Sequence, residues 1–162
     1  FTHIQEEIHK NCDGDYMITL MRRIMMKVSE KIAENNGSAA LVTGESIGQV
    51  ASQTIENLAV TESACAVPLL RPLVGLDKQE IIDTAVQIGT YDTSILPYED
   101  CCVLFSPKHP VLRASVEKAT EIFEKLEADE LIQAAYDKRE IKRFAARDYV
   151  AEHFATPKTE EQ

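Results

Sequence analysis

Two adjacent cysteines, Cys101 and Cys102, are the side chains in this sequence best suited to covalent chemistry. A reactive thiolate needs an accessible sulfur in a mobile or electropositive setting, and the proline-bounded segment around the pair provides access. The acidic residues directly before the pair should disfavour the thiolate, whereas Lys108 and His109 could offset that effect if the segment folds back. The alternative is that both cysteines are small, buried hydrophobic residues.

Three further positions could bind a nucleotide. Arg22 carries a guanidinium, the usual fork for phosphate oxygens, although two adjacent arginines on a helix, such as Arg22 and Arg23, more often form a solvated face. Gln53 has an amide that can contact an adenine edge or a phosphate, whereas geometry alone favours Gln49, which is one turn nearer to Gly44. Gly44 would let the backbone approach a ligand closely. Neither G-x-x-x-x-G-K-[ST] nor G-x-G-x-x-G occurs in the chain.

The stretch that would position these residues is 39–53, A-A-L-V-T-G-E-S-I-G-Q-V-A-S-Q. Residues 39–43 are an apolar run without alternation, which is typical of a strand buried on both faces of a parallel sheet. Apolar or small residues at helical spacing from Ile47 to Leu58 predict a helix that opens directly after Gly44. Strand, tight turn and helix present backbone N–H groups at the carboxyl edge of a sheet, where open α/β folds bind nucleotides. The alternative is an ordinary strand–helix turn without a ligand.

A second strand and helix follow. Residues 67–74, V-P-L-L-R-P-L-V, predict a strand that is short, because its two prolines cannot both join a hydrogen-bond ladder, and Arg71 lies at its exit. Asp77, with Glu80 three residues later, predicts the N-cap of a helix that Gly89 closes. The order strand, helix, strand, helix predicts an α/β fold in which helices flank a parallel sheet.

Helices are also predicted before the sheet. Thr2 and Gln5 resemble a capping box at the start of a helix that runs to about Asn11. Residues 16–34 have a strongly helical pattern, and the four methionines within it are typical of an adaptable core.

The remainder of the chain is more varied. Residues 90–110 keep no period for long, which indicates a functional or a mobile loop. Apolar stripes within 116–126, 131–135 and 141–145 predict further helices. Residues 156–162 form a polar tail.

Size and composition limit the class of protein. The 162 residues fit one domain, and the formal net charge of −10 argues against independent, non-specific nucleic-acid binding, which depends on basic surface. No apolar run approaches the roughly 20 residues of a membrane span, and no signal peptide opens the chain. The four cysteines show no C-x-x-C metal spacing. We therefore expect a cytoplasmic protein with reduced thiols and no structural metal.

Five motifs occur in a characteristic order and spacing: L-M-R-R-I-M (20–25), L-V-T-G-E-S-I-G-Q-V-A-S-Q-T (41–54), L-R-P-L-V-G-L-D-K-Q-E-I-I (70–82), I-G-T-Y (88–91) and L-P-Y-E-D-C-C (96–102). Together they resemble the catalytic domain of the tRNA 4-thiouridine synthetase family, ThiI, also named a thiamine-biosynthesis sulfurtransferase. The resemblance covers roughly residues 1 to 145.

The resemblance implies a Rossmann-like, pyrophosphatase-loop ATPase domain of the adenine-nucleotide α-hydrolase type. It implies an enzyme that uses ATP, with Mg²⁺, to adenylate a tRNA uridine, and then replaces the uridine oxygen with sulfur from a persulfide to give 4-thiouridine. A link to sulfur supply for the thiazole of thiamine is implied as well. Arg22, Gly44 and Gln53 resemble the family's ATP contacts, and Cys101 resembles its persulfide-bearing cysteine. The implied partners are tRNA and a persulfide donor such as a cysteine desulfurase.

The sequence departs from the family pattern at its beginning. The S-G-G-x-D-S phosphate loop, which precedes the F-T-x-I-Q segment in the family, does not occur here, and the first residue is Phe. We therefore expect residues 1–155 to be a carboxyl-terminal fragment of the catalytic domain that binds ATP weakly and is inactive alone. The alternative is a non-catalytic module that binds a sulfur donor or a partner chain. Apolar strand surface exposed by the missing part makes a homodimer plausible.

Overall fold

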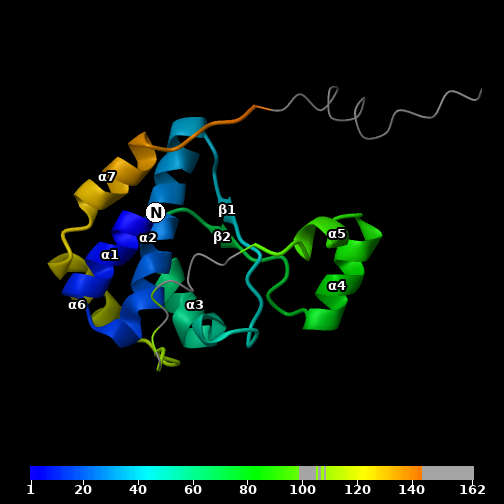
Figure 1. Ribbon diagram of the computed structural model, residues 1–162, viewed down its shortest axis with the longest axis horizontal. Coiled ribbons are helices and arrows are strands. Elements are labelled where there is room, and N and C mark those ends of the chain that lie inside the picture. Colours follow the sequence, from blue (N-terminus) through cyan, green and yellow to red (C-terminus); the bar gives the residue numbers. More distant parts are fainter. Residues whose placement is uncertain (99–104, 106, 108, 144–162) are drawn as a thin grey trace, which may run out of the picture.

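The computed structural model describes residues 1–98, 105, 107 and 109–143. Its elements form a helical layer, a small sheet in the middle and a helical hairpin on the far side (Figure 1). The helical layer contains α1 (Thr2–Asn11), α2 (Met17–Asn36), α3 (Ile55–Glu62), α6 (Val116–Lys125) and α7 (Asp129–Asp137). The sheet contains β1 (Leu41–Val42) and β2 (Leu69–Leu70), and the hairpin contains α4 (Lys78–Gln87) and α5 (Tyr91–Ser94). Short 3-10 turns cover Gly14–Tyr16 (η1) and Ala51–Gln53 (η2).

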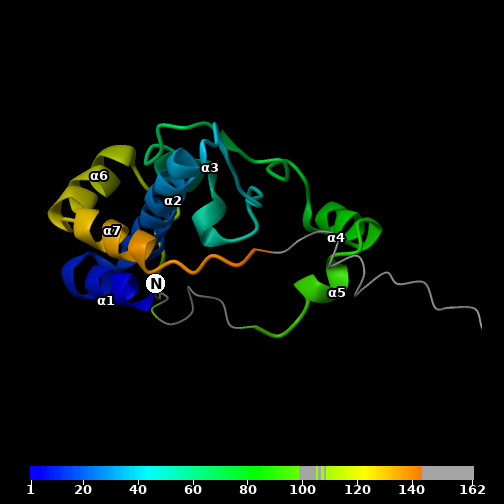
Figure 2. The same ribbon diagram turned by 90° about the horizontal axis from the view of Figure 1, so that it is seen from above.

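The long helix α2 forms the centre of the hydrophobic core, with α1, α3, α6 and α7 packed around it (Figure 2). Three of its four methionines are buried, as the helical pattern of 16–34 predicts. The helix ends where Gly37 adopts a left-handed backbone (φ 68°) and the Ser38 N–H donates to the Ala33 carbonyl at 2.8 Å. The buried side chains of the main core are Ile4, Ile8, Tyr16, Met17, Leu20, Met21, Ile24, Val60, Ala114, Ala119, Leu126, Ala128 and Ile132.

The two strands are parallel, which confirms the α/β fold and the expected strand order. Leu41 pairs with Leu69 and Val42 with Leu70, and the Thr43 N–H donates to the Leu70 carbonyl at 3.0 Å. Both strands are shorter than the apolar runs, because the prolines that flank Leu69–Leu70 have no N–H for the ladder. Burial on both faces is wrong within the described residues, since the Val42 side chain is 66% exposed.

The helix expected directly after Gly44 is wrong. Residues 44–50 form an irregular loop in which Gly48 has a left-handed backbone (φ 79°), and α3 begins only at Ile55. Thr54 caps α3 by accepting a hydrogen bond from the Asn57 N–H at 3.2 Å. The apolar spacing of 47–58 does not produce a helix that starts after Gly44, because the Ser46 hydroxyl donates to the Leu76 carbonyl at 2.7 Å. This hydrogen bond holds the loop against the exit of β2.

The helix caps agree only in part with the sequence patterns. Asp77 and Glu80 form the expected reciprocal capping box of α4, with hydrogen bonds of 2.9 and 2.8 Å, and Gly89 follows the helix with φ 72°. The capping box expected at Thr2 is wrong, because Thr2 already lies in α1 and its N-cap, Phe1, makes no side-chain cap bond.

After Gly89, the structure differs from two predictions. The segment 90–110, expected to be irregular, contains the short helix α5. Ile141, expected in a helix, lies in coil and is 65% exposed. Cys101 and Cys102, like the tail 156–162, lie outside the described residues. Among the helices that the structure describes, none is long and apolar enough to cross a membrane.

Candidate functional site

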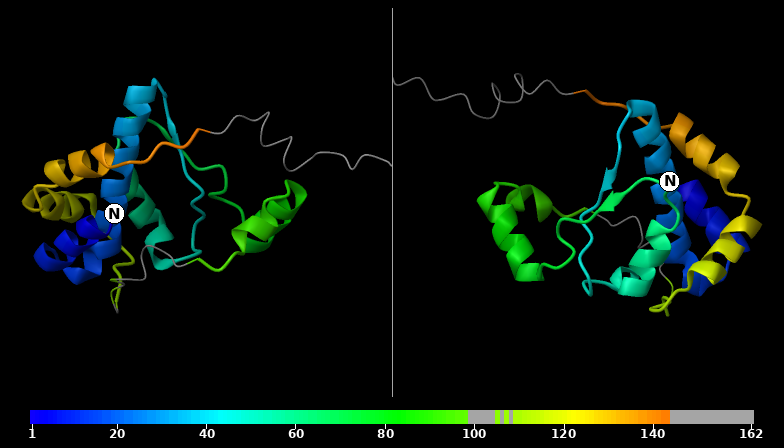
Figure 3. Two further views of the ribbon diagram at one scale, coloured as in Figure 1. Left: turned by 45° about the horizontal axis from the view of Figure 1, so that its top comes forward. Right: turned by 180° about the vertical axis from the view of Figure 1, so that it is seen from behind.

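The loops that leave β1 and β2 lie side by side at the carboxyl edge of the sheet (Figure 3). The Ile47 N–H donates to the Val74 carbonyl at 3.1 Å, and the Ser46 hydroxyl reaches the Leu76 carbonyl. These bonds join the loop after β1 to the loop after β2. Polar side chains from both loops therefore converge at this edge, where α/β folds bind ligands.

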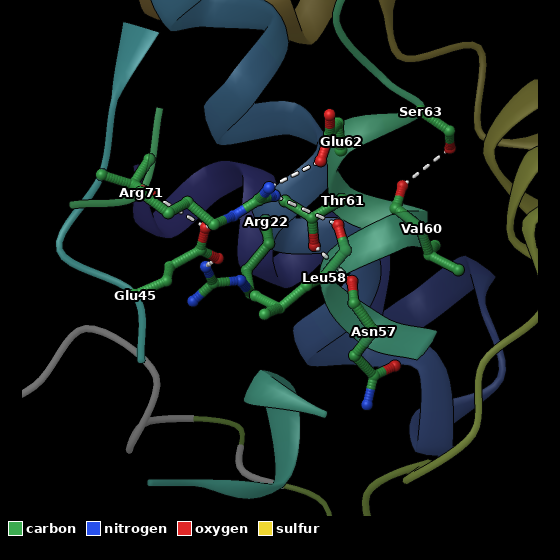
Figure 4. A network of polar contacts seen from close by, with 10 residues as sticks. Arg22, Glu45, Asn57, Leu58, Val60, Thr61, Glu62, Ser63 and Arg71 are labelled. Atoms are coloured by element: carbon green, nitrogen blue, oxygen red, sulfur yellow. Dashed lines mark hydrogen bonds and ion pairs between the residues drawn. The ribbon is translucent and has the colours of Figure 1, made fainter. Parts of the chain in front are cut away.

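A buried carboxylate, Glu45, lies at the centre of this edge (Figure 4). Its Oε1 forms an ion pair with Arg22 Nη2 of α2. Its Oε2 accepts hydrogen bonds from Arg71 Nε at 2.7 Å and from the Thr43 hydroxyl at 2.8 Å. The Glu45 side chain is only 5% exposed, so both guanidiniums are held in a setting where water screens their charge weakly.

Arg71 extends this network to α3. Its Nη1 pairs with Glu62 at 2.6 Å, and its Nη2 donates to the Leu58 carbonyl at 3.2 Å. The Glu62 side chain is 54% exposed, whereas that of Arg71 is 11% exposed. Arg71 therefore connects the exit of β2 to α3. Through Glu45, which also binds Arg22, Arg71 is connected to α2 as well.

The two adjacent arginines of α2 have separate roles, and a solvated face is wrong for both. Arg23 is 5% exposed; its guanidinium donates to the Val60 carbonyl and the Ser63 hydroxyl, each at 2.8 Å. It also lies 5.4 Å from the ring centre of Phe123, and burial lowers the pKa of this guanidinium from its ordinary value. Arg23 thus holds the core together, whereas Arg22, with a side chain 18% exposed, points to Glu45 at the sheet edge (Figure 4).

Gly44 and Gln53 stand at the two ends of the loop after β1. Gly44 does not have a left-handed backbone, and a Cβ built on it meets no described atom within 4 Å. Gln53 is half-buried in η2, and its carbonyl accepts a hydrogen bond from the Gly48 N–H at 2.9 Å. Its side-chain Oε1 is buried without a hydrogen-bond partner among the described residues. Gln49, the geometric alternative, is exposed.

The structure thus brings Arg22 next to the residue that follows Gly44, and it keeps Gln53 on the same loop. Cys101 cannot be placed relative to them, since it lies outside the described residues. Phe105, four residues further on, stacks on His9 of α1 with ring centres 5.0 Å apart. The two described cysteines, Cys12 and Cys65, are free thiols whose pKa values burial raises.

Sequence reasoning missed Glu45 as a candidate site residue, and it noted Arg71 only as the exit of a strand. A signal was available, because each residue comes within three positions of the end of a predicted parallel strand. Since such ends meet at one sheet edge, an acidic and a basic side chain there should pair. No group of His, Cys, Asp and Glu suited to a metal ion occurs among the residues that the structure describes.

Comparisons with known proteins identify relatives of this chain. Residues 1–128 match the family model described as thiamine biosynthesis protein (ThiI). A relative from Caldanaerobacter subterraneus subsp. tengcongensis, named "Probable tRNA sulfurtransferase", is 55% identical over 132 residues, which are 82% of this chain and 35% of the relative. A relative of the same name from Brevibacillus brevis is 48% identical over 147 residues, or 91% of this chain and 37% of the relative.

A solved structure is similar in fold as well. It is described as the crystal structure of a 4-thiouridine synthetase–RNA complex with bound ATP, and it superposes with a TM-score of 0.80 at 42% identity. The match covers 87% of this chain and 37% of that one. The chain therefore spans little more than a third of the length of the relatives it matches. On the family model and these identities, the chain belongs to the ThiI family of thiamine biosynthesis proteins.

Proposed function

We propose that this chain is part of an ATP-dependent tRNA sulfurtransferase that converts a tRNA uridine to 4-thiouridine. Residues 1–155 would form the carboxyl-terminal part of its catalytic domain, with 156–162 as a polar tail. The proposal is supported by the family match and by a similar structure that is described with RNA and ATP. It assigns the sheet edge around Glu45 to the adenosine phosphate of the nucleotide.

The residues at this edge fit such a ligand. The space above Gly44 is open among the described atoms, so a ligand can approach the backbone there. The buried, unpartnered Oε1 of Gln53 could accept a hydrogen bond from the adenine amino group. Arg22 would contact phosphate oxygens. Since a guanidinium has five N–H donors in a rigid fork, one carboxylate can orient it while it serves a second acceptor.

The observation that supports this assignment most directly is that the fold does not require a glycine at position 44. Its backbone is not left-handed and a Cβ would meet no described atom, so nothing in the described structure prevents an alanine there. A glycine at this position is explained if a ligand comes closer than a Cβ would allow.

Cys101 would carry the sulfur. In the proposed reaction the uridine oxygen is activated as an adenylate with release of pyrophosphate. The outer sulfur of a Cys101 persulfide then attacks the activated carbon, AMP leaves with the uridine oxygen, and Cys101 is joined to the base through a disulfide. A second thiol then attacks the Cys101 sulfur and breaks this S–S bond, which releases 4-thiouridine. The protein disulfide that forms would be reduced by an external thiol before the next cycle. A donor protein such as a cysteine desulfurase would supply the persulfide sulfur, and Mg²⁺ would accompany ATP. The same carrier would link the protein to thiamine synthesis in the cytoplasm.

Nucleotide binding can be tested on the chain itself by saturation-transfer NMR with ATP, a method that detects weak binding. We expect transfer to the adenine protons, a reduced signal in Gly44→Ala and its loss in Gln53→Ala, with unchanged circular dichroism. Gln49→Ala is the matched control, because Gln49 is an exposed glutamine of the same loop. The proposal fails if Gly44→Ala and Gln53→Ala bind ATP as the unaltered chain does.

One observation favours a second role, a module that binds another chain. The exposed face of the sheet carries apolar side chains, with Val42 66% and Leu70 53% exposed. Contiguous apolar surface of this kind marks association sites, so we propose a homodimer or a partner chain that covers it. Light scattering on the chain and on Val42→Ser should then show a concentration-dependent dimer that the substitution weakens.

A further inference from the structure

Positive charge is distributed unevenly in this acidic chain. Its formal net charge is −10, yet the segment Lys138, Arg139, Glu140, Ile141, Lys142, Arg143 carries four cations and one anion. Lys31 of α2 approaches the same place, with its Nζ 5.4 Å from the ring centre of Tyr136. We call Lys31, Lys138, Arg139, Lys142 and Arg143 the basic cluster.

The basic cluster differs from most other cations in its lack of carboxylate partners, although Lys31 donates a hydrogen bond to the Gln133 side chain. None of its five members forms an ion pair with any carboxylate in the described part of the chain. Elsewhere lysines and arginines are mostly paired: Lys10 with Glu7, Arg22 and Arg71 with Glu45, Lys27 with Glu30, Arg113 with Glu56, Lys118 with Asp13 and Lys125 with Glu121. Uncompensated positive charge is therefore concentrated at one place on the surface.

Three members of the cluster line a hollow of about 440 Å³. They belong to the segment that leaves α7 and passes the carboxyl end of α2 (Figures 1 and 3). Arg139, Lys142 and Arg143 line the hollow together with one anion, Glu140, and the side chains of Asn35 and Asn36 also contribute. A hollow of this size lies within the range of small-molecule binding sites. It brings three cations, one carboxylate, two amide side chains and an aromatic ring together, so its net charge is positive.

Tyr136 holds Arg139 in place. The Arg139 guanidinium lies 3.7 Å from the ring centre of Tyr136, its Nη1 donates to the Tyr136 carbonyl at 2.6 Å, and its Nη2 to the Tyr136 hydroxyl at 3.1 Å. This guanidinium caps the end of α7, where a cation is favourable in any case. Lys142 and Arg143 lie beyond the helix, and among the described residues they make neither a hydrogen bond nor an ion pair, so helix capping does not explain them.

We propose that the basic cluster binds the phosphate backbone of RNA. Rows of cations match the repeated charges of a nucleic acid, and guanidiniums fit phosphate oxygens. Arginine and tyrosine planes next to such cations are typical of RNA-binding surfaces, where bases stack on them. An acidic peptide would use the cations but not the stacked Tyr136 and Arg139. The inference rests on the proposed function, since it assigns to this chain a contact with the RNA substrate.

The net charge of −10 does not oppose this assignment. At physiological ionic strength the Debye length is about 8 Å, so carboxylates on distant faces are largely screened. Of the nearer ones, the Asp137 carboxylate accepts a hydrogen bond from Gln133 at 2.8 Å, and Glu140 is a single anion among the cations. The cluster should therefore bind weakly at physiological salt and more tightly at low salt.

The test is fluorescence anisotropy of a labelled, unmodified tRNA transcript titrated with the 162-residue chain at several salt concentrations. The variant Lys142→Gln/Arg143→Gln removes two exposed charges that make no described bond, so its fold should be unchanged. The matched control Lys10→Gln/Lys125→Gln removes two exposed charges from α1 and α6.

We expect the first variant to bind the transcript roughly tenfold more weakly at about 100 mM salt, and to lower the slope of log K against log salt by about 2. The control should bind as the unaltered chain does. The inference is overturned if the unaltered chain does not bind the transcript, if both variants behave alike, or if a labelled poly-glutamate peptide binds as tightly. Saturation-transfer NMR with ATP on the same variants separates the two hypotheses. If the chain binds ATP but not the transcript, this inference fails while the proposed function does not.

Discussion

Replacement of Glu45 by alanine should destabilise the fold strongly. Glu45 is a carboxylate with a 5% exposed side chain, and it serves Arg22 and Arg71, whose side chains are 18% and 11% exposed. Removing one partner of a buried ion pair leaves uncompensated charge and costs about 3–5 kcal/mol. Since 1 kcal/mol lowers the melting temperature of a chain of this size by roughly 2–4 °C, the expected shift is roughly 6–20 °C.

The matched control is Glu62→Ala, which removes the other carboxylate on Arg71. Its side chain is 54% exposed, so its pair at 2.6 Å should contribute less than about 1 kcal/mol. Urea unfolding followed by circular dichroism measures both losses. Glu45→Gln keeps the side-chain volume and provides a folded variant if alanine prevents folding. The reasoning is refuted if Glu45→Ala or Glu45→Gln is no more destabilising than Glu62→Ala.

Three further outcomes can be measured. Asp77→Ala removes the N-cap of α4 and should cost about 1 kcal/mol, seen as faster hydrogen exchange of the first α4 amides only. Glu30 is buried, which raises its pKa, but hydrogen bonds from the Ala66 N–H and from Lys27 outweigh burial and lower that pKa below its ordinary 4.5. Its contribution to stability is thus present above 4.5 and lost as pH falls through the lowered pKa; urea titrations should show Glu30→Gln less stable than the unaltered chain at neutral pH and equal to it in acid. Gly48→Ala should cost about 1–2 kcal/mol in thermal unfolding because of its left-handed backbone, whereas Gly44→Ala should cost far less.

Short-range patterns predicted the elements that depend on short-range chemistry. The capping box at Asp77 and the core helix 16–34 are both confirmed, because an N-cap or an apolar face is decided within a few residues. The parallel pairing of the strands also followed from the order of elements. The start of α3 did not follow, since it depends on Ser46 bonding to Leu76, thirty positions away in the sequence.

The residues of the candidate site stay a prediction from the resemblance, and their arrangement could not be read from the sequence. Motif resemblance supplied Arg22, Gly44 and Gln53, and the structure adds the carboxylate that orients the first of them. The sequence could not show that Arg22 and Arg23 have different roles, because the helical period alone does not tell which of two neighbouring arginines faces the core and which faces the sheet edge. It is decided by what lies opposite each of them: Glu45 at the sheet edge for Arg22, and the Val60 carbonyl and Ser63 for Arg23.

Under the proposed function, Glu45 would couple stability to ligand binding. The same carboxylate holds the exits of both strands against α2 and α3 through Arg71, and it fixes the direction of the Arg22 guanidinium. A phosphate that binds Arg22 adds a second anion beside a buried one, which is unfavourable unless the cations outnumber the anions. Arg22 and Arg71 together supply two positive charges to one buried carboxylate, and Glu62, the remaining anion, is largely exposed to solvent. The site therefore retains positive charge in its buried part, which is the condition that an anionic ligand requires.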